Sequence, residues 1–200
     1  MSYVAMERER LPIGSIGRRA TGWWAMLFIV ATEAAIFAYL LFSYYFFAIQ
    51  PHSAPWPPGG PPELRLALPN TVILIASSVA VWWGEEGIRR GGSGRLTIAL
   101  LIAFVLGVAF VVIQGLEWSN KTFSFSSGVF GSLYYTITGF HMAHVVVGLV
   151  VLLAMLAWSA LGYFNAVRHA AISIGALYWH FVDVVWLTVF FTFYVTPRIG

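Results

Sequence analysis

The feature that most constrains this chain is a set of five long apolar stretches. A helix needs about 20 apolar residues to cross the hydrocarbon core of a membrane. Backbone polar groups in lipid are satisfied only within helices or a closed barrel, and these stretches lack the alternation that a barrel strand requires. We therefore expect an all-α polytopic membrane protein, a bundle of five transmembrane helices over about residues 22–48, 66–84, 96–115, 128–158 and 171–195.

Composition supports a membrane protein and excludes several kinds of site. The chain is 60% hydrophobic and 10% charged, whereas soluble domains average about 25% charged residues. It contains no cysteine, which excludes disulfides, thiol nucleophiles, iron–sulfur clusters and thiolate zinc sites. We expect one membrane domain over residues 1–200, with a Pro-rich connection at residues 51–62 as its one clear linker.

Charge and proline placement give the expected topology. Eight Arg residues fall on the side that carries the N-terminus, and three Lys or Arg residues fall on the other. The positive-inside rule then places the N-terminus in the cytoplasm and the C-terminus outside. The prolines fall in loops, in tails or at helix starts, where a missing N–H costs nothing. The net charge of +3 is ordinary for a membrane protein, and we expect no nucleic-acid partner.

Five ionisable side chains lie within the predicted spans, at depths from the middle to the inner half of the membrane. They are Glu33, His141, His144, His180 and Asp183. Such groups are costly in lipid and face other helices or water. We expect them to form one buried polar layer that joins the first, fourth and fifth helices. Their role is either proton-linked or purely structural, and the sequence leaves both interpretations open.

The fourth span carries two patterns, a histidine pair that has alternative interpretations and a pair of small residues. His141 and His144 share a helix face because they are three residues apart, so they are either haem or metal ligands or hydrogen-bonding partners of other helices. A bis-histidine haem would use one of them with His180. Gly139 and Ala143 form a small-xxx-small pair, which permits close helix approach.

Two long motifs carry a resemblance to a known family. The segments TGFHMAHVVVG and YWHFVDVVWL are similar to signatures of haem–copper oxidase subunit III. Shorter matches occur in the family's order and extend the resemblance over about residues 22–195. These matches are Thr32-Glu33, Asn70-Thr71, Ser77-Ser78, and the Q-x-x-E pair Gln114 and Glu117.

The resemblance implies the short, five-helix form of this subunit, which carries no haem or copper itself. Those cofactors belong to partner subunits, and the chain is expected to pack against catalytic subunit I and to bind phospholipid in a cleft. Glu33 takes the place of the family's buried carboxylate, and the histidines with Asp183 take the place of its buried polar set. Lipid contacts are expected at Arg168, His169 and Trp179. Ser173 and Ser127 depart from positions where the family often has an acid.

The expected function is that of a non-redox accessory subunit of a respiratory oxidase that reduces oxygen to water and pumps protons. The subunit would stabilise the catalytic subunit and support proton uptake in a bacterial cytoplasmic membrane. We expect no catalytic residue and no metal ligand in this chain, and either cytochrome c or quinol as the electron donor. The alternatives are an accessory subunit of a nitric oxide reductase, a bis-histidine haem membrane cytochrome and a small transporter.

Overall fold

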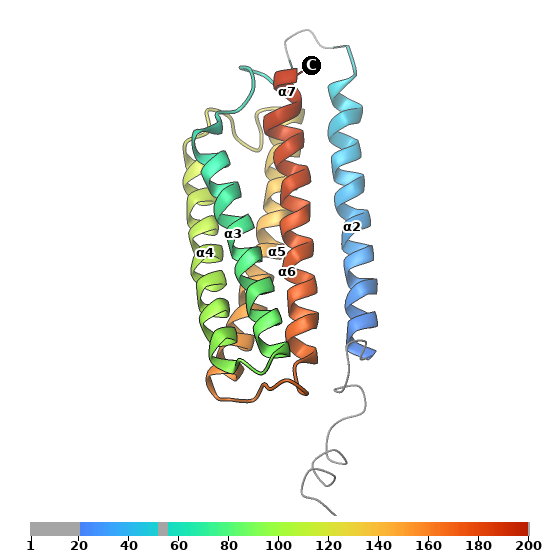
Figure 1. The fold of residues 1–200 in the computed structure, drawn as a ribbon. Coiled ribbons are helices and arrows are strands. Elements are labelled where there is room, and N and C mark those ends of the chain that lie inside the picture. The colour runs from blue at the N-terminus through green and yellow to red at the C-terminus, as the bar shows by residue number, and fades with distance from the viewer. Residues whose placement is uncertain (1–20, 52–55, 200) are drawn as a thin grey trace, which may run out of the picture.

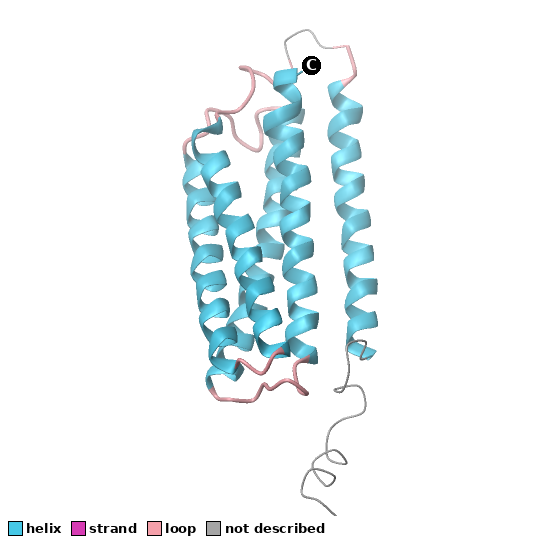
Figure 2. Ribbon diagram, in the orientation of Figure 1, coloured by secondary structure: helices cyan, strands magenta, loops and turns pink. Residues whose placement is uncertain are grey.

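The computed structural model describes residues 21–51 and 56–199, and the described residues are helical without any strand. Five helices are long and apolar enough to cross a membrane, which confirms the expected fold class (Figures 1 and 2). The elements are α2 (Thr21–Ala48), α3 (Leu64–Arg89), α4 (Ser93–Ser119), α5 (Val129–Ala160), α6 (Ala170–Phe190), the π-helical turn η1 (Phe191–Val195) and α7 (Thr196–Ile199).

The helices run up and down in a bundle, with α2 at one edge (Figure 1). Helices α3, α4, α5 and α6 pack against one another, whereas α2 makes its principal contacts with α5 and α6. In the most apolar window of α2 only 6% of residues are buried, against 50% in the last span. Most of the α2 surface is therefore left for lipid or for another chain.

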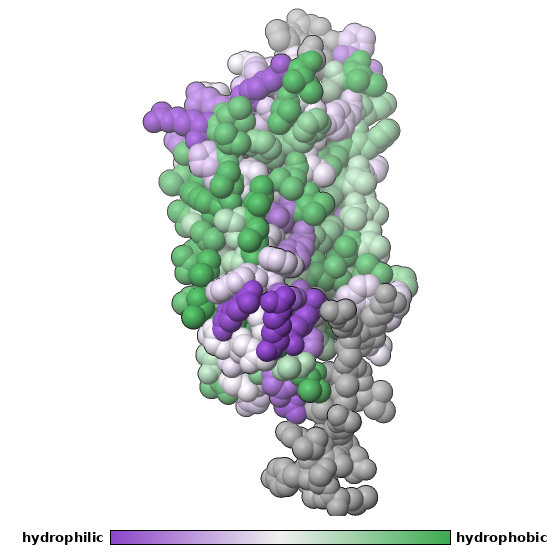
Figure 3. All heavy atoms as spheres, in the orientation of Figure 1, coloured by the Kyte–Doolittle hydropathy of each residue, from purple (hydrophilic) through white to green (hydrophobic). Residues whose placement is uncertain are grey.

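The two ends of the bundle differ in their connections. The α2–α3 and α4–α5 connections lie at the same end as the last helical turn, and we call this the Pro-loop end (Figure 1). The α3–α4 and α5–α6 connections lie at the other end, the Arg168 end. Figure 3 shows a hydrophobic belt between them, interrupted on this face by hydrophilic residues near α3 and α6.

Helices α3 and α4 are longer than their apolar stretches. The extra turns carry ion pairs one helical turn apart, such as Arg89–Glu85 at 2.5 Å and Arg90–Glu86 at 2.7 Å. Pairs at this spacing support a helix outside the apolar region. Hydropathy measures only the apolar part, which is why it predicts shorter helices.

The expectation that every proline lies outside the helices or at their starts is wrong for Pro69. Helix α3 begins at Leu64, so Pro69 lies in its second turn. A proline there leaves the carbonyl four residues earlier, that of Arg65, without its intrahelical bond. Arg65 is exposed at the helix end, where water can take the place of that donor.

A tryptophan joins three helices in the core. Trp179 of α6 is 1% exposed, and its indole N–H donates to Ser77 Oγ of α3 at 3.1 Å. An added Cβ at Gly148 or Gly107 would lie within 3 Å of the Trp179 ring. Close approach therefore depends on these two glycines. An added Cβ at Gly139 would meet nothing within 4 Å, so no other helix in the described part of the chain packs closely against Gly139.

Candidate functional site

Glu33 and His144 form a polar contact between α2 and α5. Glu33 Oε2 lies 3.0 Å from His144 Nε2, although the two residues are 111 positions apart. The Glu33 side chain is 30% exposed and that of His144 is 15% exposed. Glu33 lies near the middle of α2, so this contact is only partly enclosed at a depth where lipid surrounds the bundle. We call it the α2 seam.

Hydrogen-bond chemistry fixes the proton count of the α2 seam. His144 Nδ1 lies 2.7 Å from the Phe140 carbonyl oxygen, and a carbonyl only accepts, so Nδ1 must carry a proton. The contact with Glu33 then holds one further proton, on the carboxyl group or on Nε2. Either arrangement is neutral overall, which suits a site within a membrane. Tyr178 of α6 donates to the His144 carbonyl at 3.4 Å and brings a third helix to the seam.

His141 lies in an aromatic surround one turn away. It is 1% exposed, and its ring centroid lies 5.0 Å from that of Trp186, 5.9 Å from Phe110 and 6.4 Å from Phe37. Neither ring nitrogen has a hydrogen-bond partner among the described residues. Aromatic rings occupy the space that a haem on His141 would need, so the site does not fit that cofactor.

His180 and Asp183 lie at a different interface, between α6 and α3. His180 Nδ1 is 3.2 Å from Ser78 Oγ, and Asp183 is 8% exposed with Oδ1 unpartnered among the described residues. Closer to the Arg168 end, Ser173 donates to Glu85 Oε1 at 2.7 Å. An acid in place of Ser173 would face the Glu85 carboxylate, which gives a physical reason for serine here.

Four of the five membrane residues therefore occupy two interfaces, and His141 lies apart from them among aromatic rings. The α2 seam joins α2 to α5, whereas His180 and Asp183 face α3. Within the described residues, no hydrogen bond links the two groups. One continuous layer was expected because depth along a helix can be counted from the sequence. The direction in which a side chain points around the helix axis was not available from that count.

Two of the three residues expected to contact lipid are placed where they could do so. Arg168 and His169 lie in the α5–α6 connection at the Arg168 end, and both are half-buried. The backbone N–H of Arg168 donates to Asn165 Oδ1 at 2.8 Å, which shapes this turn. Trp179 is enclosed by protein, so a lipid contact there does not agree with the structure.

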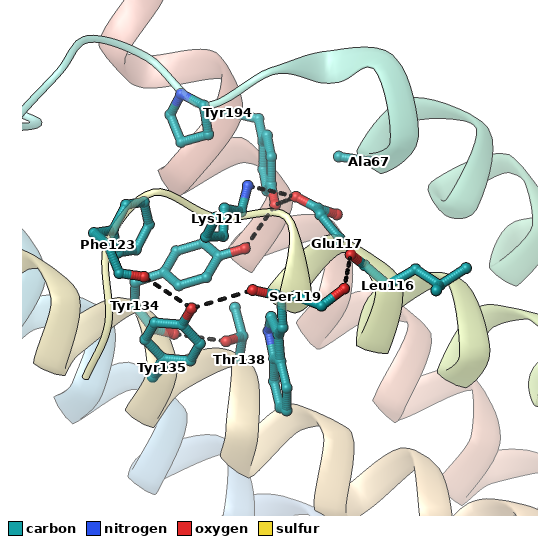
Figure 4. A network of polar contacts seen from close by, with 12 residues as sticks. Ala67, Leu116, Glu117, Ser119, Lys121, Phe123, Tyr134, Tyr135, Thr138 and Tyr194 are labelled. Carbon is teal, nitrogen blue, oxygen red and sulfur yellow. Dashed lines mark hydrogen bonds and ion pairs between the residues drawn. The ribbon is translucent and has the colours of Figure 1, made fainter.

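A buried polar cluster that the sequence did not single out lies at the Pro-loop end (Figure 4). Lys121 Nζ lies 2.7 Å from Glu117 Oε1 of α4. Tyr194 of η1 donates to the same oxygen, and its hydroxyl lies 3.1 Å from that of Tyr134 of α5. We call these four residues the Glu117 cluster. It draws the ends of three elements together.

The π-helical turn makes this arrangement possible. Thr192, Phe193 and Tyr194 are consecutive and all buried, so three successive side chains of this turn face protein. Thr192 Oγ1 lies 3.1 Å from the Tyr45 hydroxyl of α2, while Tyr194 faces Glu117. The Q-x-x-E motif and the four-residue spacing of Glu117 and Lys121 are the signals from which part of this cluster could have been found.

Comparisons with known proteins cover most of the chain. The family model of cytochrome c oxidase subunit III matches residues 18–197. The cytochrome c oxidase subunit 3 proteins of Myxine glutinosa and Rattus norvegicus are each 33% identical to the chain over 177 residues, or 86% of this chain and 68% of the relative. That of Drosophila yakuba is 32% identical over the same length. The chain belongs to the cytochrome c oxidase subunit III family.

As a subunit III, the chain is an accessory subunit of a haem–copper oxidase, a terminal oxidase complex that contains other subunits. These matches do not favour a nitric oxide reductase subunit or a membrane cytochrome. The family match includes both the α2 seam and the Glu117 cluster. The five apolar helices make this subunit III a multi-pass membrane protein.

Possible metal ligands in this subunit III are dispersed. Within residues 21–51 and 56–199, no group of three or more His, Asp or Glu side chains converges as metal ligands would. Glu33 and His144 form one pair, and His180 with Asp183 forms another on a different interface. The contacts that these groups make are hydrogen bonds to neighbouring helices.

Proposed function

We propose that this subunit III stabilises catalytic subunit I of a proton-pumping oxidase in a bacterial cytoplasmic membrane and supports its proton uptake. Haem and copper are held by the partner subunits, and oxygen is reduced there to water. The relatives are subunits of cytochrome c oxidases, which favours cytochrome c over quinol as the electron donor. The distribution of Arg and Lys favours a cytoplasmic N-terminus.

The observation that carries this proposal is the α2 seam. Helix α2 is anchored to the core through few groups, and one of them is a titratable pair that is partly exposed at mid-helix depth. Ionisable groups in a membrane are usually covered by protein or by a water-filled cavity. A neighbouring subunit or bound phospholipid along the seam would supply that cover. The pair can also relay a proton while remaining neutral overall.

Phospholipid binding has a second support at the Arg168 end. Arg168 and His169 lie in the connection between two helices long and apolar enough to span a membrane, and such a connection would meet the lipid headgroups. Cationic groups near a membrane surface attract anionic lipid. We propose that these two residues hold a phosphate group while acyl chains cover the exposed side of the α2 seam.

The variant Glu33→Gln tests the role of the α2 seam in the intact oxidase complex. The amide N–H₂ of the introduced glutamine can still donate to His144 Nε2, but the titratable proton is lost. We expect normal assembly and a normal visible spectrum, with a lower proton-pumping ratio or a shorter enzyme lifetime during turnover. The matched control is Glu86→Gln, which changes a partly exposed acid at the Arg168 end, outside the α2 seam. Normal pumping and lifetime in Glu33→Gln would contradict the proposal.

A second experiment tests where the cofactors lie. The complex is purified through a tag on this chain, and the chain is then separated from its partners in detergent. We expect the haem spectrum to remain with the large partner and the separated chain to be colourless. Haem that stays with the separated chain, and is lost on changing His144 or His180, would contradict the assignment of the cofactors to the partner subunits.

A further inference from the structure

A pocket of about 550 Å³ lies at the Pro-loop end of the bundle. One wall is the chain between Pro58 and Leu66, and the other is Glu117 with the stretch from Asn120 to Phe123. Small-molecule sites usually enclose about 300–1,000 Å³. The pocket is therefore large enough for a lipid headgroup and its glycerol. It lies at the opposite end of the bundle from Arg168 and His169.

The wall formed by the α2–α3 connection is held in place before any ligand binds. Pro58, Pro61 and Pro62 restrict its backbone, and Gly59 and Gly60 supply the positive φ values of 80° and 87° at its turn. Arg198, from the last helical turn, donates to the Pro62 carbonyl. A preformed wall lowers the entropy lost on binding.

The charges on the two walls are mixed and unequally engaged. Lys121 is committed to Glu117 and lies over the rings of Tyr134 and Tyr194. In the described part of the chain, Arg65 makes no ion pair and is exposed. Glu117 is 4% exposed, and its Oε2 has no hydrogen-bond partner among the described residues. The pocket therefore offers an available guanidinium beside an unsatisfied carboxylate.

We propose that this pocket binds a phosphoethanolamine headgroup, with its phosphate at Arg65 and its ammonium group at the carboxylates of Glu117 and Glu63. A guanidinium binds phosphate oxygens through charge-assisted hydrogen bonds. Ionised carboxylates only accept hydrogen bonds, and a primary ammonium group has three N–H donors to offer them. Leu66 and Phe123 supply an apolar surface for the glycerol and the first acyl carbons.

This chemistry separates phosphatidylethanolamine from other common lipids. The quaternary ammonium group of phosphatidylcholine has no N–H donor, so it leaves the carboxylate oxygen unsatisfied. Phosphatidylglycerol brings its phosphate without a cation, which places an anion beside two acids. Like-charge contact of this kind opposes binding. The site is independent of the role proposed for Glu33.

The test is native mass spectrometry of the intact oxidase complex in detergent, titrated with phosphatidylethanolamine, phosphatidylcholine and phosphatidylglycerol of the same acyl chains. The principal variant is Arg65→Gln, which changes an exposed residue and leaves the Glu117 cluster intact. The matched control is Arg90→Gln, which changes an exposed arginine at the other end, outside both proposed lipid sites. We expect Arg65→Gln to weaken one phosphatidylethanolamine-binding event about tenfold, the effect of losing about 1.4 kcal/mol of charge-assisted bonding.

Each outcome of the titration decides for or against the proposal. Selective loss of phosphatidylethanolamine in Arg65→Gln, and not in Arg90→Gln, supports it. Competition by soluble glycerophosphoethanolamine supports it too and shows that the headgroup suffices, whereas selective binding of the lipid without such competition shows that acyl chains are required. Equal binding of phosphatidylcholine at the same site would overturn the ammonium assignment. Identical titrations of wild type and Arg65→Gln would overturn the site.

Discussion

The carboxylates of helix α2 and of the four-helix core (α3, α4, α5 and α6) differ in their hydrogen-bond donors and in their exposure. In the core, the Glu117 carboxylate is met by Lys121 and Tyr194, and its exposure is 4%. On α2, the Glu33 carboxylate meets one imidazole and its side chain remains 30% exposed. The core encloses its charge among several donors, whereas α2 leaves its charge within reach of a neighbour.

This difference separates a carboxylate held by two protein donors from one held by a single imidazole. A buried ion pair is costly to break because the remaining partner becomes an uncompensated charge. A partly open pair has access to other partners when one is removed. We therefore expect substitutions in the Glu117 cluster to affect unfolding, and substitutions in the α2 seam to affect the working complex.

The largest effect is expected for Glu117→Leu. The change leaves the Lys121 ammonium group without its partner in a site where its side chain is 11% exposed. Breaking such a pair should lower the free energy of unfolding by about 3 kcal/mol, measured by denaturant titration in detergent micelles. The control is Glu86→Leu, which breaks the more exposed pair with Arg90 and should cost about 1 kcal/mol or less. Equal losses of unfolding free energy in both variants would show that the buried ion pair contributes no more to stability than the exposed one.

A smaller loss is expected for Gly148→Val. The added side chain would collide with the Trp179 ring, since even a Cβ would lie 2.7 Å from it. Overpacking of this kind costs about 2 kcal/mol. The matched change Gly139→Val, on the same helix with open space around it, should change the free energy of unfolding by less than about 0.5 kcal/mol. A similar loss at Gly139 would show that helix propensity, and not contact with Trp179, is being measured.

Ser77→Ala should have a still smaller effect. It removes the acceptor of the Trp179 indole N–H and leaves that donor buried. The expected cost is about 1 kcal/mol in the same unfolding assay. Ser43→Ala is the control, because Ser43 bonds the Tyr39 carbonyl of its own helix. If both variants unfold like the wild type, the hydrogen bond from Trp179 contributes little to joining α6 and α3.

The smallest effect on unfolding is expected for Glu33→Gln, a change of less than about 0.5 kcal/mol, because a donor to His144 is kept and the site is partly open. The same denaturant titration measures it. A loss as large as that of Glu117→Leu would place the α2 seam with the structural core. In that case any effect of the variant on turnover would follow from misfolding.

Several local features were predictable without tertiary information. The five spans, the loop position of residues 51–62 and the family motifs all depend on residues that are close in the chain. The ends of α3 and α4 were placed too short, because their last turns are held by ion pairs and not by apolar residues. Pro69 was expected at a helix start because the apolar stretch begins near Leu66, whereas α3 begins at Leu64.

The polar partners were harder to predict because they come from different helices. Glu33 and His144 were both identified, yet their contact depends on how α2 and α5 are rotated. Glu117 was noted in a motif, but its partner Tyr194 lies 77 positions later. The π-helical turn that brings Tyr194 inward has no signal in the apolar pattern.

Apolar length along the chain is a local property, and it alone indicates the five helices in the described residues that are able to cross a membrane. Which face of each helix meets protein is a different matter, because lipid tails are as apolar as the helix core and hydropathy does not distinguish the two. Small residues and interhelical hydrogen bonds determine which helix faces pack against protein instead of lipid. The contacts of Trp179 with Gly148, of Glu33 with His144 and of Glu117 with Tyr194 therefore emerge only when the helices are packed together.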